Sequence, residues 1–180
     1  MEIEVKYRVF DDPDLLEQAL RRRGCELSEP TRQDDQAYAE AQWDYSKSKV
    51  DVAFARLRTQ QGKHLFTVKR PTLNEMACIE FETEVADRDQ MHEAILQMGF
   101  YPTVRIVKSR RVGRIGEVSI CVDDVDGLGV FLEFEMLVDS DRHAEAVQST
   151  LDALAQSLCV RLDRVTDTYD SLIRSALVAA

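Results

Sequence analysis

The sequence predicts an α+β protein in which helices surround a closed β-sheet with a charged interior. Charged and apolar residues alternate from Glu2 onward, and the alternation recurs in at least five later segments, some acidic and others basic. Successive side chains point to opposite faces of a strand, so each segment has one charged and one apolar face. Charged faces of both signs favour a sheet that closes around them. The alternative is an open sheet with one solvated face, whose cross-strand pairs add about a few tenths of a kcal/mol each.

In the first part of the chain, capping and turn residues separate the alternating segments. Asp12 is a suitable N-cap, Pro13 suits a first helical turn, and Gly24 suits a helix end, which predicts a helix from Asp12 or Pro13 to Arg23. Glycine and proline mark the turns between the strands that follow. The expected strands are residues 2–9, about 26–38, 50–59 and 64–70, with turns at 60–63 and 71–75.

The second part of the chain follows the same logic. Gly99 ends a helix expected over residues 89–98, and residues 113–116, which begin and end with glycine, are expected to join two strands. A turn is expected at 126–129. The remaining elements are strands at 77–85, about 101–112, 117–125 and 131–138, a helix at 141–158, a short strand or turn, and a last helix near 167–177.

Two parts of the chain leave alternatives open. Residues 12–24 resemble residues 87–99, and each segment lies between two predicted strands, which suggests one domain over residues 1–180 with repeat halves of about 1–75 and 76–180. The alternative is that short capped helices look alike. Residues 39–49 are polar and aperiodic, and they form either a surface loop or a flap that packs Trp43 and Tyr45 on a base.

Charge and composition exclude several classes of protein. The formal net charge of -10 disfavours non-specific binding to nucleic acid or an anionic membrane. No apolar run approaches the roughly 20 residues needed to span a bilayer, and the acidic N-terminus does not resemble a signal peptide. The cysteines are too far apart for a CxxC motif, so we expect reduced thiols in a cytoplasmic protein; they are Cys25, Cys78, Cys121 and Cys159.

The strand faces contain the candidate chemistry. Enclosed carboxylates are costly unless cations neutralise them, and carboxylate oxygens suit Mg²⁺ or Mn²⁺. Arginine and lysine suit phosphate, so a polyphosphate with a divalent metal would satisfy both sets. The acidic set is Glu2, Glu4, Asp123, Glu133 and Glu135, and the basic set is Lys6, Arg56, Arg58, Lys69, Lys108 and Arg110. The apolar partners on the other face, including Ile79 and Phe81, are expected to form a core beneath the helices.

Several of these segments resemble the motifs of one family. The N-terminal Glu2-x-Glu4-x-Lys6 is similar to the signature of the CYTH superfamily, the triphosphate tunnel metalloenzymes. The likeness extends in order over nearly the whole chain. The further segments are Ala55-Arg-Leu-Arg58, Thr67-Val-Lys69, Ile79-Glu-Phe-Glu-Thr-Glu-Val85, Arg105-Ile-Val-Lys-Ser-Arg-Arg111, and Cys121-Val-Asp-Asp-Val-Asp-Gly-Leu-Gly129 followed by Phe131-Leu-Glu-Phe-Glu135.

The resemblance implies an eight-stranded antiparallel barrel that binds a triphosphate and two divalent ions, Mg²⁺ or Mn²⁺. Within the superfamily the chain most resembles the bacterial class IV adenylyl cyclases, which convert ATP to cyclic AMP and pyrophosphate. The features shared are the length, the turn that ends at Gly129, and a terminal helix containing Tyr169-Asp-Ser-Leu172. The resemblance also favours a homodimer, although the sequence identifies no interface.

On this basis we predict a role for each charged residue. Lys6 and Asp123 are the predicted catalytic residues, with Lys6 contacting phosphate or orienting Glu4 and Asp123 acting as ligand or proton acceptor. The predicted triphosphate-binding residues are Lys6, Arg56, Arg58, Lys69, Lys108 and Arg110. The predicted metal ligands are Glu2, Glu4, Glu82, Asp123, Glu133 and Glu135; among Glu80, Glu82 and Glu84, those that do not bind metal would pair with arginines.

Two other functions remain open at the level of sequence. The same residues would serve a triphosphatase acting on thiamine triphosphate, tripolyphosphate or a nucleotide, with water attacking the γ-phosphorus. A non-catalytic sensor or binding protein for polyphosphate or a nucleotide is a third possibility. Retention of the Glu2-x-Glu4-x-Lys6 triplet and the late acids disfavours it. No motif for reading adenine is visible in the sequence.

Overall fold

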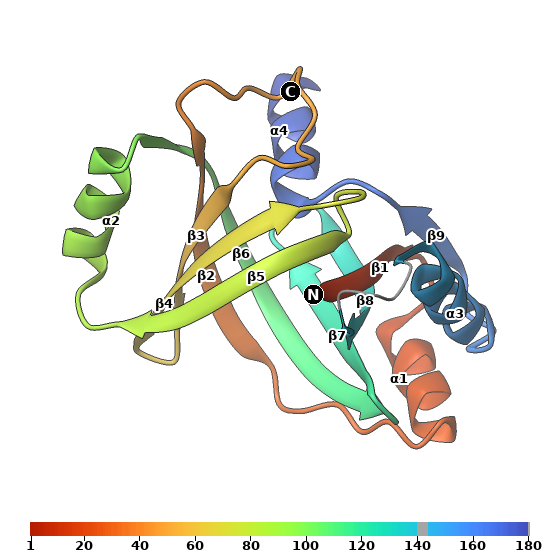
Figure 1. Cartoon of the computed structure of the whole chain (residues 1–180). Helices are drawn as coiled ribbons and strands as arrows, with labels where there is room; N and C mark the ends of the chain where they lie inside the picture. Colours follow the sequence, from red (N-terminus) through yellow and green to blue (C-terminus); the bar gives the residue numbers. More distant parts are fainter. Residues whose placement is uncertain (140–143, 180) are drawn as a thin grey trace. The chain divides into compact units, whose positions relative to one another are not determined.

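The structure, a computed structural model, describes residues 1–139 and 144–179 (Figure 1). Strands dominate, and the helices lie between them in the sequence. The elements in chain order are β1 (Glu2–Val9), α1 (Pro13–Arg22), β2 (Thr31–Glu40), β3 (Phe54–Gln60), β4 (Lys63–Pro71), β5 (Ala77–Val85), α2 (Arg88–Gln97), β6 (Phe100–Ile115), β7 (Val118–Val125), β8 (Gly129–Leu137), α3 (Ala144–Gln156), β9 (Leu162–Val165) and α4 (Tyr169–Ala179).

The fold class expected from the sequence, an eight-stranded antiparallel closed barrel with flanking helices, is confirmed. The hydrogen-bonded strand order is β5-β4-β3-β2-β6-β7-β8-β1-β9. The ninth strand, β9, is short and pairs antiparallel with the second half of β1. No helix in the described part of the chain is long and apolar enough to cross a membrane.

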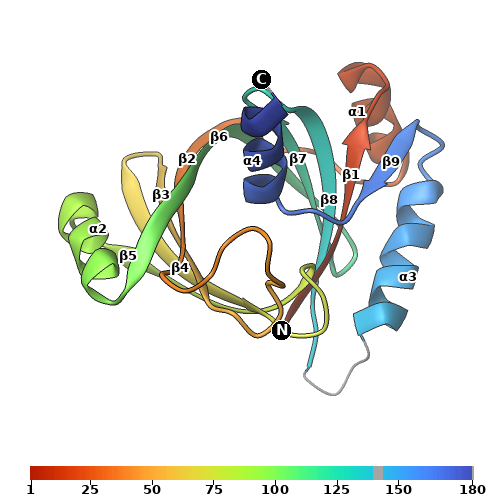
Figure 2. The same cartoon turned by 90° about the horizontal axis from the view of Figure 1, so that it is seen from above.

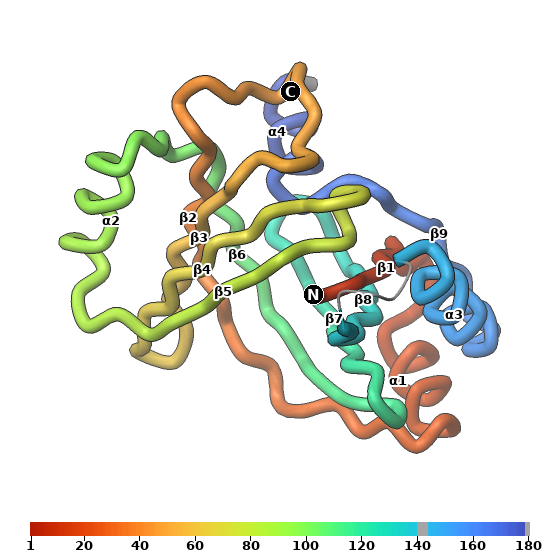
Figure 3. Tube along the Cα trace, in the orientation of Figure 1, coloured from red at the N-terminus to blue at the C-terminus, as the bar shows by residue number. Residues whose placement is uncertain are grey.

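The chain forms two compact units, and each is described by itself. Unit 1 contains Met1–Pro30 and Ser109–Thr166, and unit 2 contains Thr31–Lys108 and Asp167–Ala180. The long strand β6 contains residues of both units, because the division falls between Lys108 and Ser109. Figure 3 shows the course of the chain through this strand. Each unit therefore combines two separate stretches of chain, a division that differs from a boundary near residue 75. The internal repeat stays a prediction.

The core of unit 1 lies between helix α3 and the strands β1 and β8 (Figure 2). The apolar residues that alternate with the charged ones are fully buried there, at about 1.5–3 kcal/mol for each large side chain. Tyr7 packs edge-on against Phe134, and its hydroxyl donates a hydrogen bond to Asp152 on α3. The fully buried members are Ile3, Val5, Ile120, Leu132 and Phe134. For unit 1 the expected core beneath a helix is confirmed.

The core of unit 2 lies where α2 packs on β3, around Tyr38, Leu57 and Ile95. The expectation that Ile79 and Phe81 are buried is wrong, because they are 42% and 72% exposed. Helix α2 packs on β3 rather than on β5, so the apolar face of β5 remains at the surface. Alternation identified the faces of this strand correctly but did not indicate what covers them.

Several element boundaries differ from the expected ones. Gly113 was expected in the joint between two strands, but β6 continues through it to Ile115. A Cβ atom at Gly113 would lie 2.5 Å from Cys25 Sγ and 2.8 Å from the Glu26 carbonyl oxygen, so this glycine permits close packing rather than a turn. The strands expected from residues 26 and 50 begin at Thr31 and Phe54. The expected helix start at residues 141–143 lies outside the described residues.

Candidate functional site

Two clusters of charged side chains stand out, one in each unit. The carboxylate cluster of unit 1 contains Glu4, Asp123, Glu133 and Glu135 around the cations Lys6 and Arg110. The basic cluster of unit 2 contains Arg56, Arg58, Lys69 and Lys108 with the carboxylates Asp35, Glu80 and Glu82. Together with Glu2, the two clusters include every predicted catalytic, triphosphate-binding and metal-binding residue. Glu84, expected to bind metal or to pair with an arginine, instead forms an exposed ion pair with Lys63.

Strand register assembles the carboxylate cluster. Glu4 lies opposite Glu135 and Lys6 lies opposite Glu133 in the pairing of β1 with β8. Ser119 and Cys121 on β7 face the same two glutamates from the other side. Because alternate residues share a face, the N-terminal residues Glu2, Glu4 and Lys6 and the two late glutamates project from the same side of the sheet.

Arg110 connects three of the carboxylates. It donates to both oxygens of Asp123, at 2.6 Å from Nε and 2.5 Å from a terminal nitrogen, and it also donates to Glu133. Glu135 Oε1 lies 3.5 Å from its other terminal nitrogen. Burial opposes the charge of Arg110, but Glu133 and Asp123 raise its pKa well above the ordinary value. Asp123, which is fully buried, is therefore committed to Arg110 in this arrangement.

Lys6 is the second cation of the cluster, and its side chain is almost fully buried. Its Nζ lies 3.3 Å from Glu133 Oε1 and 3.7 Å from Glu4 Oε1. This position, between Glu4 and Glu133, is compatible with both predicted functions of Lys6, which are contacting phosphate and orienting Glu4. Glu2 lies opposite Leu137 at the beginning of the same strand pair.

Negative charge exceeds positive charge in the carboxylate cluster. Burial is the main cause of a rise in the pKa of Glu135 to about 7; Arg110 lowers this pKa, and the neighbouring carboxylates Glu133, Glu2 and Glu4 raise it. Burial also raises the pKa of the Cys121 thiol, so that this cysteine stays protonated. A carboxyl group whose pKa is raised in this way indicates a site that would gain stability from an added cation.

The donor chemistry of the carboxylate cluster fits a hard divalent cation such as Mg²⁺ or Mn²⁺, which bind carboxylate oxygens. Within residues 1–139 and 144–179, however, no three histidine, cysteine, aspartate or glutamate side chains are arranged as a ready-made metal site. The contacts of Arg110 explain this, because its guanidinium lies among the oxygens that a metal would bind.

The basic cluster of unit 2 is a ladder of cross-strand pairs. Arg56 lies opposite Thr67, which lies opposite Glu82, and Lys69 lies opposite Glu80. A terminal nitrogen of Arg56 donates to Glu82 and to Thr67 Oγ1 at 3.0 Å each, and Lys69 Nζ lies 2.5 Å from Glu80 Oε2. Glu82, a predicted metal ligand, is therefore a partner of Arg56 and Thr67 within unit 2.

Sequence reasoning missed Asp35, which anchors the basic cluster. Arg58 donates two hydrogen bonds of 2.7 Å to the two oxygens of Asp35, and both residues are buried. Burial would raise the pKa of Asp35, but the hydrogen bonds from Arg58 and the charges of Arg56 and Lys108 lower it below the ordinary value. The signal was the register of the strand, since Asp35 shares a face with Gln33 and lies opposite Arg58.

The sequence also gave no indication of Lys49, which holds the start of α4. Its Nζ donates to Asp170 and Ser171 at distances of 2.8–3.1 Å, and it also donates to Thr168. Tyr169 is on the same helix, and the Nζ atom of Lys108 lies 4.7 Å from the centroid of its ring. Helix α4 is thus attached both to the 39–49 segment and to a predicted phosphate-binding lysine of β6.

Fold and residues together define an antiparallel barrel protein with one acidic and one basic cluster of side chains. The sequence profile of the CYTH domain matches residues 1–169, so the chain belongs to the CYTH family. This is a family of triphosphate tunnel metalloenzymes, whose members process triphosphates and use divalent metal.

Individual relatives agree with this membership. The "Putative adenylate cyclase" of Methanocaldococcus jannaschii is 25% identical over 92% of this chain and 93% of its own length. A solved "putative adenylate cyclase" of Vibrio parahaemolyticus is 26% identical, with a TM-score of 0.76 over 99% of this chain and 98% of its own. A solved Hippeastrum protein, described as a "putative adenylyl cyclase" with a dominant triphosphatase activity, is 19% identical. Its TM-score is 0.66 over 98% of this chain and 96% of its own, and it is similar in fold alone.

Proposed function

We propose that this protein is a metal-dependent adenylyl cyclase that converts ATP to cyclic AMP and pyrophosphate. The observation that carries the metal-dependent part is the carboxylate cluster, in which the pKa of Glu135 rises to about 7 despite the contact with Arg110. The preference for a cyclase is supported by the turn that leads into Phe131-Leu-Glu133 and by the names of the relatives at 25–26% identity.

In this proposal the basic cluster binds the triphosphate. Arg56 and Arg58 present planar guanidinium groups that match phosphate oxygens in pairs, and Lys69 and Lys108 add point charges. Arg56 and Lys69 are partly exposed and paired with glutamates, so phosphate oxygens can replace those carboxylates. Arg58 is held by buried Asp35, which fixes its orientation. The cluster therefore combines one rigid arginine with cations that can change partners.

The carboxylate cluster would hold the divalent metal through Glu4, Glu133 and Glu135, with Glu2 as a further ligand; of the two roles predicted for Asp123, ligand or proton acceptor, we propose the second. Bound there, the metal would neutralise charge on phosphate oxygens and on the leaving pyrophosphate and would lower the pKa of a hydroxyl. For the carboxylates to bind a cation, Arg110 must give up part of its contacts, which frees a guanidinium for phosphate. Lys6, between Glu4 and Glu133, keeps these two side chains in place.

The proposed reaction is a displacement within one ATP molecule. The ribose 3′-oxygen attacks the α-phosphorus, the bond from that phosphorus to the bridging oxygen breaks, and pyrophosphate leaves. The proton of the 3′-hydroxyl goes to a base, for which Asp123 is the proposed residue once Arg110 has released one of its oxygens. Catalysis then rests mainly on positioning and charge neutralisation by arginine and lysine.

A product assay tests this proposal. Purified protein is incubated with α-labelled ATP and Mg²⁺ or Mn²⁺, and cyclic AMP with pyrophosphate is resolved from ADP with phosphate, with tripolyphosphate and thiamine triphosphate in parallel. We expect cyclic AMP, and we expect Glu4→Gln and Arg56→Ala to lower the rate by roughly 10³-fold. Arg70→Ala, an exposed residue beside Lys69, is the control that should keep full activity. Orthophosphate without cyclic AMP would replace the cyclase with a triphosphatase, and turnover of none of these substrates would leave a binding protein.

A further inference from the structure

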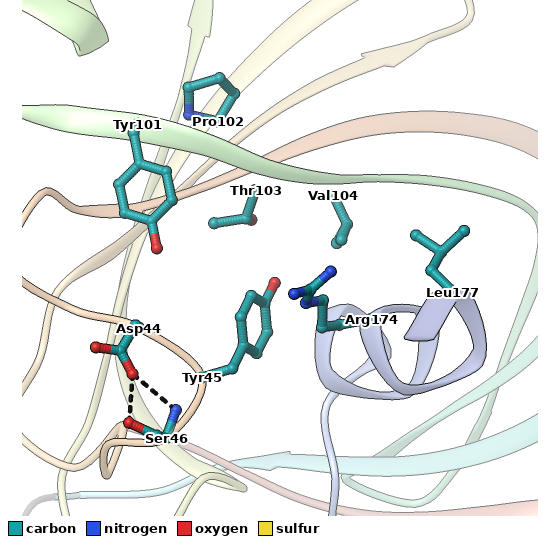
Figure 4. Close-up of a pocket in the computed structure, with 9 residues that line it drawn as sticks. All are labelled: Asp44, Tyr45, Ser46, Tyr101, Pro102, Thr103, Val104, Arg174 and Leu177. Atoms are coloured by element: carbon teal, nitrogen blue, oxygen red, sulfur yellow. Dashed lines mark hydrogen bonds between the residues drawn. The ribbon is translucent and has the colours of Figure 1, made fainter. Parts of the chain in front are cut away.

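A cavity of about 490 Å³ lies within unit 2, between residues 44–46, the beginning of β6 and helix α4 (Figure 4). Its volume is in the range of small-molecule sites, about 300–1,000 Å³. The predicted roles of the charged residues do not involve it. Its main lining residues are Asp44, Tyr45, Tyr101, Thr103, Arg174 and Leu177.

The walls of this cavity suit a flat heterocycle better than a phosphate. Tyr45 and Tyr101 project into it from two different segments, and the guanidinium of Arg174 lies 5.9 Å from the centroid of the Tyr45 ring (Figure 4). Nucleobases stack on aromatic rings and on guanidinium planes. Asp44 and Arg174 carry opposite charges, so the lining has no excess of positive charge to hold a polyanion.

Tyr45 offers its ring, rather than its hydroxyl, to the cavity. The hydroxyl is buried beside Thr103, and burial raises the pKa of Tyr45 to about 12 although the hydrogen bond with the Thr103 side chain lowers it, so the hydroxyl stays protonated. Because the hydroxyl oxygen has almost no accessible surface, the ring of Tyr45 is the part that a base in the cavity can contact.

The aromatic residues around the cavity are held in place by the rest of unit 2. Trp43 is buried and packs edge-on against Tyr45, at 4.9 Å between ring centroids. The Tyr101 hydroxyl donates a hydrogen bond to the Trp43 carbonyl oxygen at 2.9 Å. The Lys49 contacts fix the start of α4, which carries Arg174. A preformed site of this kind binds a rigid ligand with little cost of ordering.

The cavity also shares its two main elements with a proposed phosphate-binding residue. Val104, which lines the cavity, and Lys108 are on the same face of β6, four residues or about 13 Å apart. On α4, Tyr169 lies under Lys108, and Arg174 lies one to two turns further along the helix. A nucleotide with its base in the cavity could extend its phosphates along β6 toward Lys108.

We propose that this cavity is the base-binding site of the enzyme and that Tyr45, Thr103 and Arg174 determine its preference for a nucleoside triphosphate over inorganic triphosphate. This inference rests on the proposed function, because a site for a base is needed by a nucleotide substrate such as ATP and not by inorganic triphosphate. It assigns to Tyr45 and its neighbours the recognition for which the sequence shows no motif.

The test compares a ligand that has a base with one that lacks it. Binding of 3′-deoxy-ATP, which cannot cyclise, and of tripolyphosphate is measured by calorimetry with Mn²⁺, and fluorescence of Trp43, the single tryptophan, reports on occupancy of the cavity. We expect Arg174→Ala to weaken the binding of 3′-deoxy-ATP about tenfold, because the base loses one stacking partner. Tyr45→Ala should weaken binding of 3′-deoxy-ATP by a similar factor, about tenfold, through the loss of one stacking ring. Tripolyphosphate affinity should not change in either variant.

Ser175→Ala, at an exposed position of α4 outside the cavity lining, is the matched control and should bind both ligands as the wild type does. Tyr45→Phe keeps the ring and its packing on Trp43, so it should bind both ligands as the wild type does and separates a lost contact from a loss of folding. Unchanged 3′-deoxy-ATP binding in both Arg174→Ala and Tyr45→Ala, or equal losses for both ligands, would overturn the base site while the triphosphate site stands. Failure of the wild type to bind either ligand would refute the proposed function, and this inference with it.

Discussion

The two charged clusters balance their charges in opposite ways. In the basic cluster, three cations have carboxylate partners: Arg58 pairs with Asp35, Lys69 with Glu80, and Arg56 with both Glu82 and Glu80. In the carboxylate cluster, several acids share Arg110 and Lys6, and burial, together with the neighbouring carboxylates, raises the pKa of Glu135. The comparison teaches that cations outnumber carboxylates in the basic cluster, whereas carboxylates outnumber cations in the carboxylate cluster, which would gain from an additional cation.

The largest effect on stability should come from breaking the buried pair of the basic cluster. Asp35→Ala would leave Arg58 charged and buried without a partner, and we expect the free energy of unfolding to fall by about 3–5 kcal/mol. Urea unfolding at pH 7 measures the change. Glu84→Ala removes the carboxylate of an exposed pair with Lys63 and serves as the matched control, with little change expected. Similar losses in the two variants would show that burial does not distinguish these pairs.

The second prediction concerns an added cation. Mn²⁺ at about 100 times its dissociation constant should raise the free energy of unfolding by about 2.7 kcal/mol, because the metal binds the folded state alone. Glu133→Gln, which removes one charge from the centre of the carboxylate cluster, should abolish most of this gain. Thermal unfolding with and without a chelator provides the measurement. K⁺ at equal ionic strength is the control, and an equal shift with K⁺ would contradict a specific site.

The third prediction is a dependence of stability on pH in the metal-free protein. The folded-state pKa of Glu135 is about 7, above the ordinary glutamate value, so the folded state binds its proton more tightly than the unfolded state. The contribution of Glu135 to stability should therefore be most favourable at low pH and should fall as the pH rises through the interval from the ordinary glutamate pKa to about 7. Between pH 5.5 and 8 this single group should cost about 2 kcal/mol.

Glu135→Gln isolates this contribution. The variant should lose less stability than the wild type between pH 5.5 and 8 in the presence of a chelator, as measured by urea unfolding at both values. Glu117→Gln, at an exposed position of unit 1, should behave as the wild type does. If the two variants showed the same pH dependence, the excess negative charge would have to reside elsewhere in the cluster.

Much of the fold was predictable because alternation and caps are local properties of the chain. β5 (Ala77–Val85) was predicted with its observed bounds, and Asp12 and Asp87 cap their helices through the backbone N–H groups of Asp14 and Gln90. The exposure of Phe81 was not predictable, because it depends on where α2 packs. The sequence suggested a turn at Gly113 because glycine is common in turns. The actual reason for this glycine is its close approach to Cys25, a contact between residues far apart in the sequence that local patterns do not reveal.

The candidate site shows the same division. Alternation along the first strand predicted that Glu4 and Lys6 share a face, and alternation along β8 predicted the face of Glu133. The register between β1 and β8 then makes these residues neighbours. Asp35 and Lys49 were missed because their importance arises from partners distant in sequence, Arg58 and Asp170. The sequence could not show that Arg110 lies among the carboxylates, since that depends on the side-chain conformation.

The smallest effect on stability should come from the partly exposed end of the basic cluster. Lys69→Met removes a cation whose side chain is 30% exposed and whose partner is Glu80, and we expect a loss below about 1 kcal/mol. The same change should weaken tripolyphosphate binding strongly, because phosphate is proposed to displace Glu80 from this lysine. Urea unfolding and calorimetry on the same variant separate the two effects. A loss of stability as large as that of Asp35→Ala would mean that Lys69 holds the fold, and the distinction between a rigid and an exchangeable part of the cluster would be wrong.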